Sequence, residues 1–584
     1  MTMTYLRPRA RTLTLALALL LALALTAASA PLAAASSSQE SMFQDDSMLV
    51  FGDAPSRIAS TLDTLAGLGV QRIRVSVFWA DIAPDPHSAT PPSFDAADPN
   101  AYPAGNWTRY DQLVRLAQSR SIGVDFDVTS PAPLWATDSR SPLDLKSNFN
   151  PNAQAYGLFL EALGRRYSGT FVPPSSAAPT PVTPPQQTQN GGLLGILGPS
   201  PSAQAPASRT SSDPNDQIAA NNGTPLPRVN YWSLWNEPNQ PGWLLPQWSS
   251  YHGRQVERGA SIYRVLVDNG VRGLDSSGHG HDTILIGETA PKGAPDRRAV
   301  SALTPLRFIR RLYCLGDKLR PLSGSAAAAA GCPLQNIRSV FPRLHPALFT
   351  TTGFADHPYS LLFAPSVVDI DPDWAAIGEL GRLTHTLDRA FSAYGSRRRV
   401  PIFLTEYGYQ TNPPDPYSGL PLSAQAAYID QADYIASRNS RVATLSQFLL
   451  RDDRPLAGAA PGTPAYWSTF QTGLEYADGS PKPSLIAYRL PVWIPQPTVK
   501  LGHKMLVWGQ LRLAPHNVAQ AAQIQFAPNG SGSFSPIATR TTANPEGFFT
   551  ARVGLPGSGQ LRVAWTDSSG NSDYSRTVNV TVVR

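Results

Sequence analysis

The chain has 584 residues, which exceeds the roughly 100–200 residues of a single compact domain, so we expect one large domain and something smaller. Its formal net charge of +6 is small for this length, and no block of lysine and arginine follows the first residues, which argues against a nucleic-acid partner. The two cysteines are too few to ligate a structural zinc ion, and no metal or organic cofactor is implied.

The first 35 residues have the pattern of a secretory signal peptide. Three arginines precede an apolar run from Leu13 to Leu25, and small residues follow up to a cleavage motif near Ala35. Because the run is shorter than the ~20 residues that span a bilayer, we expect a secreted, extracellular protein without stable membrane association, and a membrane anchor is the alternative. In that oxidising compartment Cys314 and Cys332 most simply form one local disulfide bond, with two unpaired thiols as the alternative.

From about Met48 to Leu490, short β-like runs alternate with helix-like segments, which is typical of repeated βα units. Eight strands closing into an α/β (β/α)₈ barrel would remove both sheet edges; an open doubly wound sheet is the alternative, but no glycine-rich phosphate motif follows any strand. We expect this domain to cover residues 36–494, with strands near 47–53, 70–79, 122–135, 229–239, 283–291, 354–360, 400–409 and 442–450.

Two further segments differ from this alternation. Residues 170–227 are rich in Pro, Ser, Ala, Gln and Asn, so we expect a disordered or loosely held insertion before the fourth strand, on the N-terminal side of the barrel. Residues 495–584 contain short alternating runs separated by turn residues, which predicts a small immunoglobulin-like β-sandwich. We expect this sandwich to be an accessory module whose removal leaves the chemistry of the barrel largely intact.

Two glutamates end expected strands: Glu237 in "SLWNEPN" ends the fourth, and Glu406 in "IFLTEYGY" ends the seventh. Both follow apolar runs, where an unpaired carboxylate is costly unless it has partners or a task. Either glutamate alone could cap a helix or pair with an arginine. Since every strand of a barrel delivers its last residues to one face, the two together indicate a pair of acids that meet over the barrel mouth.

These motifs, with "RIRVSVFW" at the second strand, "HPYS" at the sixth and the closing "TGLEYADGSPKPSLIAY", resemble the retaining (β/α)₈-barrel glycoside hydrolases of the cellulase-like clan that includes families 5 and 39. The resemblance spans the whole first domain. It implies a monomeric enzyme that hydrolyses O-glycosidic bonds of a poly- or oligosaccharide by double displacement, with two carboxyl groups ~5–5.5 Å apart. A catalytically silent carbohydrate-binding barrel and a transglycosylase are the alternatives.

The resemblance also implies roles for single residues. Glu237 would be the general acid/base, Glu406 the nucleophile, and Asn236 a ligand of the sugar 2-hydroxyl. Arg74, near the start of the second strand, would reach Glu406 and keep it ionised, since an adjacent cation favours a carboxylate. Pairing of Arg74 with Asp127 is the alternative.

His357 and Tyr359 lie on one face of their strand because two residues separate them. We therefore expect the imidazole to approach Glu237 and the phenol to approach Glu406. The alternatives are a core histidine bonded to a backbone carbonyl and a tyrosine that only packs.

Aromatic side chains near strand ends are candidate platforms on which sugar rings stack, although core packing would explain some of them equally well. Where many members of the clan carry a tryptophan at the end of the eighth strand, this chain has Gln447 or Phe448, so a tryptophan from the following loop is a candidate substitute. The candidate platforms are Trp79, Trp135, Trp243 and Trp467.

Overall fold

The computed structural model describes residues 39–52, 54–174, 214–219 and 223–584. The expected signal peptide and most of the expected insertion lie outside these residues. Among the helices of the described ranges, none is both long and apolar enough to cross a membrane.

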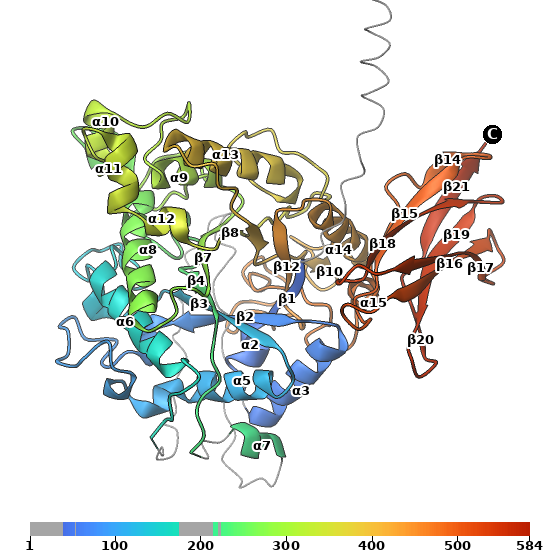
Figure 1. The fold of residues 1–584 in the computed structure, drawn as a ribbon, viewed down its shortest axis with the longest axis horizontal. Helices are drawn as coiled ribbons and strands as arrows, with labels where there is room; N and C mark the ends of the chain where they lie inside the picture. The colour runs from blue at the N-terminus through green and yellow to red at the C-terminus, as the bar shows by residue number, and fades with distance from the viewer. Residues whose placement is uncertain (1–38, 53, 175–213, 220–222) are drawn as a thin grey trace, which may run out of the picture.

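Eight parallel strands form a closed barrel, in the order β1-β12-β9-β8-β7-β4-β3-β2, which confirms the expected barrel (Figure 1). Six of the strands lie within the expected ranges, and β8 begins one residue before its range. The first does not: the run at 47–53 contains no strand among its described residues and begins in a short helix, α2 (Asp46–Leu49), which the Asp45 side chain caps by accepting a hydrogen bond from the Met48 amide. The strands are β1 (Glu40–Gln44), β2 (Arg72–Phe78), β3 (Gly123–Thr129), β4 (Tyr231–Leu234), β7 (Thr283–Thr289), β8 (Gly353–Asp356), β9 (Ile402–Leu404) and β12 (Val442–Phe448).

Helices surround the barrel (Figure 1). The helices α6 and α8 approach each other closely, since a side chain at Gly157 of α6 would meet the Asn269 carbonyl of α8 and one at Gly273 of α8 would meet the Gly157 carbonyl. Both positions therefore require glycine. The helices are α3 (Pro55–Gly67), α4 (Trp79–Ile82), α5 (Thr108–Gln118), α6 (Ala153–Arg166), α7 (Pro214–Ala219), α8 (Arg258–Ser276), α9 (Pro305–Leu312), α10 (Gly324–Ala329), α11 (Ile337–Leu344), α12 (Ala347–Thr350), α13 (Leu380–Ala393), α14 (Leu422–Ser437) and α15 (Pro483–Arg489).

The expected disulfide bond is present between Cys314, just after α9, and Cys332, just after α10, with Cα atoms 6.0 Å apart. It closes the loop that contains α10. The Arg264 guanidinium of α8 donates to the backbone carbonyls of Leu312 and Arg311 beside it. The disulfide bond and these hydrogen bonds together hold the loop between Cys314 and Cys332 against α8.

The C-terminal strands form two sheets with a common apolar core that includes Val507, Ile524 and Val563. Figure 1 shows them as a separate body beside the barrel, coloured orange to red. An immunoglobulin-like topology stays a prediction. One sheet contains β13 (Val492–Trp493), β15 (Lys504–Gln510) and β18 (Phe548–Gly554); the other contains β14 (Thr498–Lys500), β16 (Gln520–Pro528), β17 (Ser535–Thr542), β19 (Gly559–Thr566), β20 (Ser572–Tyr574) and β21 (Val578–Val583).

Buried contacts join this sandwich to α14 and α15 of the barrel domain. Arg512 donates to Asp433 at 2.8 Å, and both side chains are about 95% inaccessible. The Arg512 guanidinium also lies 3.8 Å from the centre of the Tyr488 ring, and Trp508 packs edge-on against Tyr434. This interface argues against a freely separable accessory module.

We therefore expect Arg512→Ala to lower the free energy of unfolding by about 3–5 kcal/mol, because it leaves the Asp433 carboxyl buried without its partner. Arg489→Ala is the matched control. Its ion pair with Asp573 also joins the two domains but is partly exposed, so its loss should cost only ~0–1 kcal/mol. Calorimetric unfolding measures both variants, and equal effects would show that the buried pair contributes nothing special.

Candidate active site

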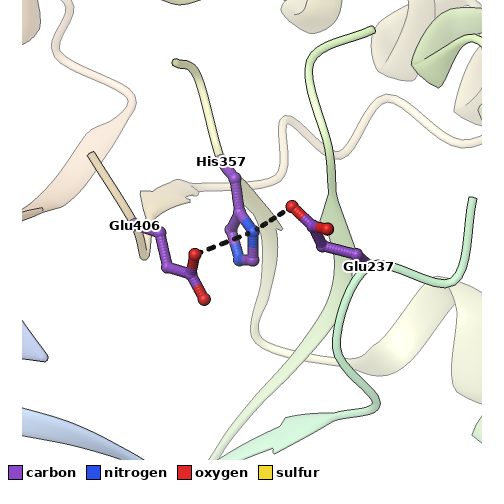
Figure 2. Close-up of side chains that lie close together, drawn as sticks. All are labelled: Glu237, His357 and Glu406. Carbon is purple, nitrogen blue, oxygen red and sulfur yellow. Dashed lines mark hydrogen bonds and ion pairs between the residues drawn. The ribbon is translucent and has the colours of Figure 1, made fainter. Parts of the chain in front are cut away.

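Three side chains from three different strands meet at the barrel mouth (Figure 2). Glu237 follows β4, His357 follows β8 and Glu406 follows β9. One oxygen of each glutamate and a ring nitrogen of His357 all lie within 4.8 Å of one another. All three residues are buried. The two acids that the sequence singled out therefore lie over the same point.

The backbone around Glu237 is held in an unusual conformation. Trp235 and Glu237 have φ values of 72° and 37°, a left-handed region that costs a non-glycine residue roughly 1–3 kcal/mol. The Asn236 amide donates to the Thr129 hydroxyl, and the Asn239 side chain donates to two backbone carbonyls. These bonds maintain the turn, which points the Glu237 carboxyl at His357.

Both oxygens of Glu406 accept hydrogen bonds. Arg74 donates to Oε1 at 2.7 Å and the Tyr359 hydroxyl donates to Oε2 at 3.0 Å, while His357 Nδ1 lies 3.5 Å from Oε2. Burial raises the pKa of Tyr359 well above its usual value, so the phenol keeps its proton and remains a donor. The contact expected between Tyr359 and Glu406 is thus present.

Arg74 organises the floor of the site. It is fully buried, and besides Glu406 it contacts Asp127 at 3.2 Å, so the two partners weighed from the sequence are both present. It also donates to the Asn236 side-chain oxygen at 2.8 Å. Burial alone would lower the pKa of Arg74, but the surrounding carboxylates outweigh burial and raise it. Its positive charge is therefore permanent.

Glu288 is a third strand-end glutamate that the sequence reasoning overlooked. It ends "TILIGET" on β7, and its Oε2 accepts hydrogen bonds from His357 at 2.8 Å, Arg74 at 3.1 Å and the Thr405 hydroxyl at 2.6 Å. Burial would raise the pKa of Glu288, but the charges of Arg74 and His357 lower it to about 2. The signal was available, since an acid also ends this apolar strand, but no family motif surrounds it.

Both ring nitrogens of His357 face carboxyl groups. Nδ1 lies 3.0 Å from Glu237 Oε1 and Nε2 lies 2.8 Å from Glu288 Oε2. Burial would lower the pKa of His357, but Glu406, Glu237 and Glu288 raise it to about 10. Both ring nitrogens are thus engaged by carboxyl oxygens, an arrangement that suits proton transfer among these groups.

The charges of the cluster balance when Glu237 carries a proton. Arg74 and His357 supply two positive charges, and Glu288 and Glu406 supply two negative ones. Burial raises the pKa of Asp127 well above its usual value, so this partner of Arg74 adds no charge. Burial raises the pKa of Glu237, and the hydrogen bond and charge of His357 offset this only in part. The two acids of the pair thus differ in environment, which is how like residues acquire unlike roles.

The aromatic candidates separate into core and rim. Trp79 is fully buried and stacks on Phe159 at 5.7 Å, so its prediction as a sugar platform is wrong: it begins α4 and turns into the core. Trp243 is also buried, whereas Trp135 and Trp467 are partly exposed. The Trp135 indole donates to the Pro84 carbonyl, and Trp467 packs edge-on against Tyr466 in the loop after β12.

The end of β12 carries Phe448 at the site. Its ring is partly exposed and lies 6.4 Å from that of Tyr359 and 5.3 Å from that of Phe470. Gln447 is buried and donates to the carbonyls of Phe448 and Thr472, so it supports the backbone. Of the two residues weighed for this position, Phe448 is the one whose ring reaches the site.

No family model and no curated protein match the chain. Among solved structures it is similar to exo-β-1,4-mannosidase Op5Man5 from Opitutaceae bacterium strain TAV5, at 13% identity and a TM-score of 0.38, with 77% of this chain and 58% of that chain covered. It is also similar to the family 51 α-L-arabinofuranosidase AbfB from Bifidobacterium longum, at 12% identity and a TM-score of 0.39, with 90% of this chain and 95% of that chain covered. The β-glycosidase from Thermosphaera aggregans is similar at 14% identity and a TM-score of 0.37, with 76% of this chain and 87% of that chain covered. These neighbours are glycoside hydrolases, but similarity this low assigns neither a family nor an activity to the chain.

Proposed function

We propose that the protein is a retaining glycoside hydrolase that cleaves O-glycosidic bonds of a poly- or oligosaccharide, in the clan of families 5 and 39. The spacing of two carboxyl groups carries the proposal. One oxygen of Glu237 lies within 4.8 Å of one oxygen of Glu406, which fits the ~5–5.5 Å between the carboxyl groups of retaining enzymes better than the ~6.5–9.5 Å of inverting ones. The disulfide bond favours an oxidising compartment and so supports secretion.

In the first step Glu406 attacks the anomeric carbon while Glu237 gives its proton to the departing oxygen. An ester then links the sugar to Glu406. In the second step Glu237, now a carboxylate, takes a proton from water, and the water oxygen displaces Glu406 from the sugar. Arg74 and Tyr359 donate hydrogen bonds to the two oxygens of Glu406. They stabilise the carboxylate before attack and again when the ester is hydrolysed.

The position of His357 suits both halves of this cycle. The negative charge moves from Glu406 to Glu237 when the ester forms. His357 Nδ1 lies 3.5 Å from one acid and 3.0 Å from the other, so the imidazolium is adjacent to the charge in either state. The net charge of the cluster stays zero throughout, which avoids leaving an unbalanced charge in a buried site.

A panel of activated 2-fluoro sugars read by intact mass tests the proposal. We expect one sugar to add covalently, and peptide mapping to place the adduct on Glu406. The same panel of sugars as aryl glycosides should identify a substrate. If no aryl glycoside is cleaved and no fluoro sugar adds, the protein is a carbohydrate-binding barrel and the hydrolase proposal is wrong.

A further inference from the structure

We infer that Glu288 is a positioning residue that keeps His357 in the imidazolium form, so that Nδ1 of the ring has no lone pair with which to take the proton of Glu237. The inference deepens the proposed function and rests on it for the role of Glu237. Glu288 Oε2 accepts hydrogen bonds from His357, Arg74 and Thr405, and none of these is one of the two acids of the proposed reaction. It acts through the ring of His357.

The geometry around Glu288 is that of a fixed anion. The strand β7 shifts register between Ile286 and Thr289, and within this bulge Gly287 and Glu288 have φ values of 110° and 44°. A bulge re-aims a side chain, and here the Glu288 carboxylate points at Nε2 of His357. Its Oε2 also accepts from Arg74 and Thr405, so the carboxylate is held by three donors.

The remaining charged and titratable groups that face His357 cannot replace Glu288. Glu237 and Glu406 both lie at Nδ1, on the opposite edge of the ring. Arg74, from β2, is a cation and opposes a positive charge on the ring. Asp356 of β8 precedes His357, but its carboxyl group accepts a hydrogen bond from the Thr289 hydroxyl instead. The carboxyl of Glu288 alone faces Nε2 among the residues that the structure describes.

Removal of this charge alters the acid. Without Glu288, His357 loses the carboxylate at Nε2, so the two protons on His357 and Glu237 are held less firmly. Whichever of His357 and Glu237 releases its proton first, we expect that release at a lower pH than in the wild type. If the ring becomes neutral, Nδ1 can also accept the proton that Glu237 needs to give to the leaving oxygen.

The test compares the full-length protein with Glu288→Gln, a change that removes the charge and keeps the shape. Nuclear magnetic resonance of ¹⁵N-labelled histidine, with His357 assigned from His357→Asn, reports the ring directly. In the wild type we expect His357 to stay doubly protonated between about pH 5 and pH 8. In Glu288→Gln its titration midpoint should fall by roughly 1–3 pH units, the usual effect of losing an adjacent charge.

Kinetics give a second readout. The alkaline limb of kcat/KM should move to lower pH in Glu288→Gln and return part of the way in Glu288→Asp, which restores the charge. Glu379→Gln is the matched control: Glu379 is equally buried and lies in the segment after β8, but its carboxylate accepts from the backbone amides of Asp369 and Ala376. This variant should keep the wild-type profile.

The inference is wrong if His357 of the wild type loses a proton below about pH 8. It is also wrong if a folded Glu288→Gln variant keeps both the wild-type ring titration and the wild-type alkaline limb. Should Glu288→Gln fail to fold, the wild-type titration and Glu288→Asp still decide. An inactive wild-type protein with the expected ring titration would instead overturn the proposed function and leave the role of Glu288 toward His357 intact.

Discussion

Glu406→Ala is expected to abolish turnover, with kcat falling on the order of 10⁵-fold or more, the scale found when the nucleophile of another covalent mechanism is removed. Alanine cannot form the ester with the anomeric carbon, and Arg74 and Tyr359 lose the acceptor that both bind. Initial rates with an aryl glycoside identified from the panel measure the loss.

The control for this variant is Glu161→Ala, which removes a glutamate paired with Arg165 on the outer helix α6 and should leave the rate unchanged. Addition of azide to Glu406→Ala should restore part of the turnover and yield a glycosyl azide of inverted configuration, because azide enters from the side that the glutamate occupied. Ordinary turnover by Glu406→Ala, or an azide product of retained configuration, would contradict the assignment of the nucleophile.

Glu237→Ala should behave differently according to the leaving group. With a poor leaving group, which needs a proton, kcat should fall roughly 10²–10⁴-fold. With an activated leaving group the ester should still form, and it should accumulate because no base activates water. A burst of released aglycone followed by a slow steady state is therefore expected, with azide restoring turnover and giving a product of retained configuration.

The pH profile provides a further check on Glu237. Burial raises the pKa of Glu237, so the wild type should lose activity as the pH rises through that pKa and the acid gives up its proton. Glu237→Ala should lack this alkaline limb with activated substrates. A variant that keeps both the limb and ordinary activity without azide would show that another group is the acid/base.

Seven of the eight barrel strands could be located from sequence because each is an apolar run bounded by turn residues or a helix-like segment. The first strand, "ESMFQ", is short and mixed in polarity, and the more apolar run after it begins in a short helix that Asp45 caps. Glu237 and Glu406 could be placed at the barrel mouth from sequence because each lies in a motif at the end of an expected strand. Their contacts follow from the closure of the barrel.

Other parts of the site could not be derived from the chain alone. The burial of Trp79 depends on the rings of Phe159 and Tyr156, which come from a helix far along the sequence. The role of Glu288 depends on a bulge that no local pattern announces. The pairing of Arg512 with Asp433 joins two domains, and neither residue has a neighbour in sequence that indicates its partner.

The pairing of β1 with β12 has a consequence for how the protein is made. These strands close the barrel, yet the backbone carbonyl of Glu40 and the Thr444 hydroxyl that bonds it are 404 positions apart. During vectorial synthesis the first strand must therefore wait for nearly all of the domain before its partner emerges. Contacts this distant slow folding, and an unpaired edge is prone to association with other chains. Nascent chains that stop before residue 442 should accordingly depend on chaperones and aggregate when released.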